Sequence, residues 1–143
     1  MKLISNYKRR FRKIYKFLWI IINMEEAKKW FSKALEDFDT AKYNLKGKKI
    51  DAGLFYLQQS AEKALKAVYI NKFKNLIKIH DLVVLAKKIN APVNIIDFCK
   101  KLNPAYQYTR YPDAVAKIEN PEAKANEFIN YVEEILKWTK KNL

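Results

Sequence analysis

Cysteine and histidine are nearly absent from this chain of 143 residues, which holds one of each, Cys99 and His80. A single cysteine excludes a disulfide framework within the chain and a CxxC metal site. A single histidine excludes the multi-histidine centres that bind most protein zinc, and it leaves His80 as the only ordinary general base near neutral pH. We therefore expect no metal site and no cofactor.

Glycine and proline are also scarce, with two and four residues respectively. A β-sandwich or barrel needs turn residues about every 8–12 positions, so this composition excludes an all-β fold. Half of the residues are apolar and 14% are aromatic. A chain of this length and composition forms one ordinary domain with its own hydrophobic core.

Acidic residues are outnumbered by 15 to 29, which gives a formal net charge of +14. Half of that excess comes from residues 1–23, which contain seven Lys and Arg and no acid. Such a surface attracts phosphate groups or anionic lipid without identifying a partner. An ordinary lysine-rich, solvated surface explains the composition equally well.

Residues 1–23 differ from the rest of the chain. Their apolar residues follow helical spacing, with basic residues between them: Ile4, Tyr7, Phe11, Ile14 and Leu18. The apolar run at 17–22 is far shorter than the roughly 20 residues that span a bilayer, and no small-residue cleavage site follows it. Three interpretations stay open: a basic amphipathic helix on a membrane or nucleic acid, an additional packing helix, and a misassigned start upstream of a native Met24. We expect a cytoplasmic protein.

From Met24 onward the apolar spacing is helical throughout. A first helix is expected to end at Gly47 with a left-handed cap, a second to be capped by Asp51, and a third to run from about His80 to Ile89. The expected inward residues of the first two helices are Ala27, Phe31, Leu35 (with Ala34), Phe38, Ala41 and Leu45, then Leu54, Leu57, Ala61, Leu65 and Val68. The expected inward residues of the fourth helix are Val93, Ile96, Cys99 and Leu102. The last helix is expected to begin at Asn120-Pro121 and to bury Phe128, Val132, Ile135 and Leu136.

Connections between these helices are short, which favours antiparallel neighbours. We therefore predict an all-α fold, an up-down antiparallel bundle of four to five helices, plus a basic N-terminal helix or extension. The predicted division is an extension at 1–23 and a bundle at 24–143.

Arg110 is the only arginine outside residues 9–12, although the chain has 25 lysines. A guanidinium offers a planar, two-pronged donor to phosphate or carboxylate and stacks on aromatic rings. Its neighbours Tyr106, Tyr108 and Tyr111 supply such rings, or faces on which bases stack. The structural alternative is an ion pair with Asp113 or another carboxylate that holds the loop to the bundle.

Two other segments carry polar residues of interest. Gln58, Glu62 and Lys66 share one flank of the second helix, where the simplest interpretation is a solvent-exposed ladder; Gln58 could instead line a groove or an interface. Asp81 is expected to cap the third helix, with His80 packed on the end of the bundle.

Several of these segments together resemble the HEPN domain (higher eukaryotes and prokaryotes nucleotide-binding). The resemblance covers residues 24–142. The matching pieces, in chain order, are Ala34-Leu35-Glu36-Asp37, Phe55 with the run from Gln58 to Ala67, His80-Asp81-Leu82 with Leu85, and Tyr106 with the run from Thr109 to Asp113. Residues 1–23 have no counterpart.

The resemblance implies a dimeric helical bundle, often paired with a small nucleotidyltransferase in toxin–antitoxin or related systems. Many family members are metal-independent ribonucleases that use an arginine followed, after four to six residues, by a histidine. Here Arg110 is followed by Val115, Ala116 and Lys117 at those positions, and no histidine lies C-terminal to it.

We therefore predict a non-catalytic binding module that forms a homodimer and engages a nucleotide, RNA or a minimal nucleotidyltransferase. The candidate ligand-binding residues are Arg110, Tyr106, Tyr111, Asp113, His80, Gln58, Glu62 and Lys66. A first alternative is a divergent ribonuclease that uses Arg110 and His80. A second alternative is a peripheral protein held on a membrane surface by residues 1–23.

Overall fold

The fold contains helices and no strand, as predicted for an all-α protein. A computed structural model describes all of residues 1–143. The elements are α1 (Lys2–Lys46), α2 (Ile50–Phe73), α3 (Leu82–Lys88), α4 (Val93–Leu102), α5 (Ala105–Tyr108) and α6 (Pro121–Lys141). None of these helices is both long enough and apolar enough to cross a membrane.

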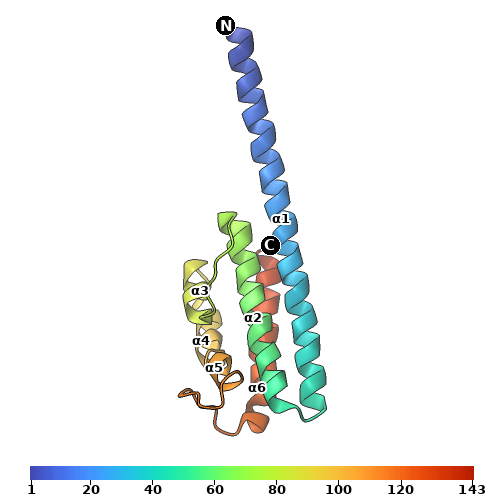
Figure 1. The fold of residues 1–143 in the computed structure, drawn as a ribbon, viewed down its shortest axis with the longest axis vertical. Coiled ribbons are helices and arrows are strands. Elements are labelled where there is room, and N and C mark those ends of the chain that lie inside the picture. The colour runs from blue at the N-terminus through green and yellow to red at the C-terminus, as the bar shows by residue number, and fades with distance from the viewer.

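Three long helices, α1, α2 and α6, form the body of the bundle, and α3, α4 and α5 lie against one side of it (Figure 1). The short α1–α2 connection makes these two helices antiparallel, as expected. Helices α2 and α6 are also in contact, but they run in the same direction (Figure 1), because α3 to α5 lie between them in the chain. The ends of α2 and α6 meet where the Asn71 side chain donates a hydrogen bond to the Asn142 carbonyl.

The core is a single cluster of 24 buried residues. All the inward residues predicted for the second and last helices are buried. Two predictions of inward residues were wrong. Leu35 is 43% exposed, because the seam of α1 passes through Ala34 instead, and Val93, at the first turn of α4, is 74% exposed while Ile95 is buried.

Polar contacts also join α1 to α2. The Lys63 ammonium pairs with the buried Asp37 carboxylate, and the Ser60 hydroxyl donates to the Ala34 carbonyl at 2.7 Å. Ser60 and Lys63 flank Glu62 on α2, so both contacts hold this segment of α2 in register against α1.

Helix ends depart from the sequence expectations at Gly47 and at Asp51. Gly47 has φ −81°, and the left-handed residue of the α1–α2 turn is Lys48, with φ 62°. Asp51 lies within the first turn of α2 and does not cap it; Lys49 occupies the N-cap position without a side-chain hydrogen bond. Helix α3 begins at Leu82, directly after its predicted cap Asp81 and two residues beyond the expected start at about His80.

The N-terminal half of α1 projects beyond the bundle as one continuous helix (Figure 1). Residues 1–19 are all exposed, and Ile20 is the first partly buried residue. The helix has no start at Met24, because it passes through that residue without interruption. Within one chain, residues 1–19 therefore do not pack as an additional helix of the bundle.

Candidate functional site

The flank of α2 that carries Gln58, Glu62 and Lys66 is buried, with exposed fractions of 0%, 4% and 5%. The prediction of a solvent-exposed ladder was therefore wrong. The reason is that α2 is the central helix, in contact with α1, α3, α4, α5 and α6, and it has no free flank at this level. The Gln58 carbonyl accepts a hydrogen bond from Gln59, while its amide nitrogen has no partner.

Glu62 links two basic side chains. One carboxylate oxygen lies 3.3 Å from the Lys66 ammonium, and the other lies 3.0 Å from His80 Nδ1. The Lys66 ammonium also lies over the Trp30 ring of α1. Buried charges need such partners, because an unpaired ion loses its hydration without compensation.

This contact orients His80. An ionised Glu62 accepts a hydrogen bond from Nδ1–H, which leaves Nε2 on the opposite edge of the imidazole. The His80 side chain is 54% exposed, whereas that of Glu62 is 6% exposed. The imidazole is thus held at Nδ1 by a buried carboxylate while half of its side chain stays exposed, an arrangement that suits a proton donor, proton acceptor or anion ligand.

Tyr106 joins His80 to Arg110. The imidazole stacks on the Tyr106 ring with centroids 5.1 Å apart and planes 20° apart. The Arg110 guanidinium carbon lies 3.9 Å from the centre of the same ring and 4.6 Å from the centre of the Phe55 ring. One guanidinium nitrogen donates to the Tyr106 carbonyl at 2.8 Å, and the other N–H groups of the fork have no partner within the protein.

Asp81 and Asn103 fix the backbone next to His80. The Asp81 carboxylate accepts hydrogen bonds from the Val83 and Val84 N–H groups and from the Asn103 side chain. The Asn103 side-chain oxygen accepts from the Leu82 N–H at 2.9 Å. Burial acts to raise the pKa of Asp81, but these hydrogen bonds outweigh it and lower the pKa below its ordinary value. The predicted capping role of Asp81 is confirmed.

A surface cleft of about 530 Å³ lies beside this cluster. Its lining residues are His80, Asp81, Lys100, Asn103, Pro104, Tyr106, Gln107 and Ala116. The cleft therefore brings together the exposed imidazole, one aromatic ring, one lysine and the Asp81 carboxylate, whose charge is partly offset by its three hydrogen-bond donors. The imidazole and the lysine are the groups of this lining that suit an anionic ligand.

Some predicted site residues lie outside this cluster. Tyr111 is 54% exposed, and Asp113 is exposed and forms no ion pair with Arg110. The structural alternative, an ion pair of Arg110 with Asp113 or another carboxylate, was wrong, since the guanidinium lies over two aromatic rings instead. Cys99 is buried, as predicted for a core residue, and burial raises the pKa of its thiol to about 12, with a smaller contribution from Asp81.

Two residues of the site were missed as site residues from the sequence. Phe55 lies one turn before Gln58 on α2 and forms part of the ring cluster around Arg110. Asn103, directly before Pro104, binds both the side chain of Asp81 and the backbone of α3. The Asn-Pro pair was a detectable signal for a chain turn, but nothing local shows which helix its side chain contacts. No group of three or more His, Cys, Asp or Glu side chains lies together as a metal site requires.

The family model described as HEPN domain matches residues 27–143. The chain belongs to the HEPN domain family. Among curated protein sequences none matches this chain. The family model leaves out the projecting part of α1 and covers every helix that forms the site.

Solved structures agree with this assignment. An archaeal HEPN homologue, ST0689, superposes with a TM-score of 0.66 and 30% identity, over 80% of this chain and 95% of that one. The structure of TT1696 from Thermus thermophilus superposes with a TM-score of 0.71 and 24% identity, over 82% of this chain and 98% of that one. At that identity TT1696 supports the fold alone.

Proposed function

We propose that this HEPN protein is a binding module for a phosphate-bearing ligand, a nucleotide or RNA, held at the cluster of His80, Tyr106 and Arg110. The observation that supports this most strongly is the arrangement of Arg110. Its guanidinium is stacked on two rings and bonded to one backbone carbonyl, yet no carboxylate neutralises it. An arginine held in one orientation with free donors is suited to a bidentate contact with phosphate.

The side chains around Arg110 fit the other parts of such a ligand. His80 and Lys100 line the adjacent cleft and add positive or hydrogen-bonding groups for phosphate oxygens. The Tyr106 ring lines the cleft and lies against both the imidazole and the guanidinium, so it holds these two groups next to a ligand in the cleft.

Arg110→Lys tests the proposal, because it keeps the charge and removes the planar fork. A charge-assisted hydrogen bond contributes about 1.5–3 kcal/mol, so affinity for ATP or a single-stranded RNA oligonucleotide should fall about tenfold to a hundredfold. Affinity is measured by titration calorimetry or fluorescence anisotropy, together with the melting temperature of the same sample.

Arg12→Lys is the matched control, since it makes the same exchange on the exposed N-terminal part of α1. Equal affinities of the Arg110→Lys and Arg12→Lys proteins would refute the proposal. A lower melting temperature of Arg110→Lys with unchanged affinity would show that the arginine only holds α5 to α2.

The proposal extends to protein partners, a second copy of this chain and a minimal nucleotidyltransferase, as in toxin–antitoxin-like systems. Family membership supports both. Sedimentation equilibrium at micromolar concentration should give twice the 17.0 kDa of one chain, and a single-chain mass would count against the dimer. Co-purification of the two proteins after joint expression tests the nucleotidyltransferase.

Metal-independent RNA cleavage is a second candidate function, favoured by one observation. The carboxylate-oriented His80 and Arg110 contact the same tyrosine ring, although His80 precedes Arg110 in the chain by thirty positions. An arginine that stabilises charge and a histidine that moves a proton are the two groups such a reaction needs.

The two candidates differ in a direct assay. A binding module leaves RNA intact in the presence of EDTA, which is the result we expect. Cleavage above background that His80→Ala abolishes, while Lys100→Ala leaves it in place, would favour the ribonuclease.

A further inference from the structure

The projecting part of α1 presents two chemically different sides. Its apolar residues recur at intervals of three and four positions, which places them in one stripe along the helix. The stripe consists of Ile4, Tyr7, Phe11, Ile14, Leu18 and Ile21, widened by Leu3, Tyr15 and Ile22, and every one of these side chains is 40% exposed or more. We call it the apolar stripe. It extends for about 30 Å at 1.5 Å per residue.

The stripe points away from the bundle. Eighteen residues make about five helical turns, so residues eighteen apart lie on the same side of α1. The residues eighteen positions after Phe11 and Leu18 are Lys29 and Glu36, and both are exposed on the outer side of the bundle. The apolar stripe is therefore not a continuation of the core seam.

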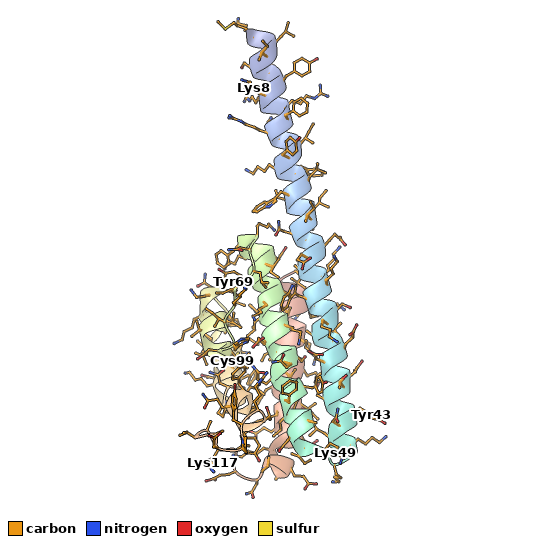
Figure 2. All side chains as sticks on the ribbon, viewed as in Figure 1. Lys8, Tyr43, Lys49, Tyr69, Cys99 and Lys117 are labelled. Atoms are coloured by element: carbon orange, nitrogen blue, oxygen red, sulfur yellow. The ribbon has the colours of Figure 1, made fainter.

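Over residues 2–16 the opposite side of the same segment is basic, whereas the run at 17–22 is apolar on all sides and adds the exposed Phe17 and Trp19 to the apolar surface. Arg9 and Lys16 lie eighteen positions before the buried residues Ala27 and Ala34, so they are on the side of α1 that faces the core further along the helix. Two further bases, Lys8 and Arg10, follow the borders of the apolar stripe by the same helical geometry. No acid occurs among residues 1–23. Figure 2 shows the side chains of this segment standing free of any other element.

We propose that residues 3–22 lie in the surface of an anionic phospholipid bilayer, with the apolar stripe inserted and the basic residues among the head groups. This arrangement is that of interfacial amphipathic helices, which combine a Lys- and Arg-rich face with an aromatic and aliphatic face. Because the stripe and the bundle lie on opposite sides of α1, the bundle and its His80–Arg110 cluster remain on the aqueous side without a steric clash.

Charge and apolar surface together favour lipid over two other occupants. A second copy could cover the stripe, but it would add seven more bases, and Lys8 and Arg10 would find no acid of the other segment to pair with. A nucleic acid could neutralise the bases, but it would leave the apolar stripe in water. An anionic bilayer satisfies both faces at once.

Vesicle flotation of the full chain tests the proposal, with phosphatidylcholine vesicles compared against vesicles that contain about 30% phosphatidylserine. The chain should float with the anionic vesicles only. Phe11→Asp/Leu18→Asp places two charges in the inserted face and should lower the partition coefficient about tenfold or more. Lys8→Gln/Arg10→Gln should lower it about fivefold for each charge removed.

Tyr43→Asp/Val93→Asp is the matched control. It makes the same change in charge at two exposed apolar residues, 81% and 74% exposed, that lie on the bundle itself, and its partition should equal that of the unaltered chain. Equal loss in the control, or equal binding to neutral and anionic vesicles, would overturn the proposal.

Two further measurements identify the other occupants: sedimentation in the absence of lipid, and binding of RNA. An oligomer that Phe11→Asp/Leu18→Asp dissociates, in a chain that binds no vesicles, would replace the bilayer with a second copy. RNA binding that Lys8→Gln/Arg10→Gln abolishes, again without vesicle binding, would replace it with a nucleic acid. Arg110→Lys should leave flotation unchanged, so this proposal and the proposed ligand site fail or succeed separately.

Discussion

Glu62→Gln is the sharpest test of how the site is built. The substitution keeps the shape of the side chain and removes the negative charge of Glu62, which contacts two basic groups, Lys66 at 3.3 Å and His80 at 3.0 Å. The side chains of Glu62 and Lys66 are each only 6% exposed. Removal of one partner from a buried ion pair costs about 3–5 kcal/mol, because the other charge stays buried without compensation.

We expect a value near the lower end, about 3 kcal/mol, since the glutamine oxygen still accepts a hydrogen bond from Lys66. For a domain of this size 1 kcal/mol lowers the melting temperature by about 3–5 °C, so the expected shift is roughly 10–15 °C. Thermal unfolding followed by circular dichroism measures it, and urea unfolding gives the free energy directly.

Glu134→Gln is the matched control. The Lys137–Glu134 pair has the same separation of 3.3 Å, but its side chains are 64% and 51% exposed. A surface pair contributes about 0–1 kcal/mol, so this variant should melt within about 4 °C of the unaltered protein. Equal shifts for Glu62→Gln and Glu134→Gln would refute the reasoning from burial.

The double variant Glu62→Gln/Lys66→Met separates charge from packing. It removes both buried charges, and the methionine keeps most of the volume of the lysine stem, so it should recover much of the stability that Glu62→Gln loses. A double variant as unstable as the sum of its single changes would show that the two side chains act independently.

Three further outcomes are expected. A protein that starts at Met24 should melt within about 2 °C of the full chain, because residues 1–19 are exposed and none of residues 1–23 belongs to the core cluster. A much lower melting temperature or loss of solubility would contradict this. The pKa of Asp81 is lowered in the folded protein. Its contribution to the free energy of unfolding should therefore be complete above the ordinary pKa near 3.8, and it should decline as the pH falls through the lower pKa of the folded protein. Asp81→Ala should cost about 0.5–2 kcal/mol at pH 7 as a lost helix cap, and acid titrations of both proteins by circular dichroism should converge at low pH. Cys99, with its pKa raised to about 12 by burial, should resist iodoacetamide at pH 8 until urea unfolds the chain, and rapid alkylation of the native protein would show that this part of the core opens.

Much of the fold followed from local pattern. The apolar spacing of α2 and α6 predicted which residues are buried, because one face of a helix in a bundle must meet the core. The Asp81 cap was also predictable, since an aspartate before an apolar helical run satisfies N–H groups within its own turn. Predictions that depended on the exact geometry of a turn, at Gly47 and Asp51, were wrong.

The sequence by itself determined the helical class, the basic and apolar faces of residues 1–23 and the singular position of Arg110, because each depends on residue identity and spacing along one segment. Only the tertiary structure decided that Gln58, Glu62 and Lys66 are buried. Their flank of α2 looks polar in isolation and is covered only once the other helices surround it. The contact of His80 with Glu62 and Tyr106 was likewise decided by the fold, since it joins α2 to the segments before α3 and within α5, which are distant in the chain. Local spacing carries no information about which side chains meet across helices, and it is that meeting which forms the site.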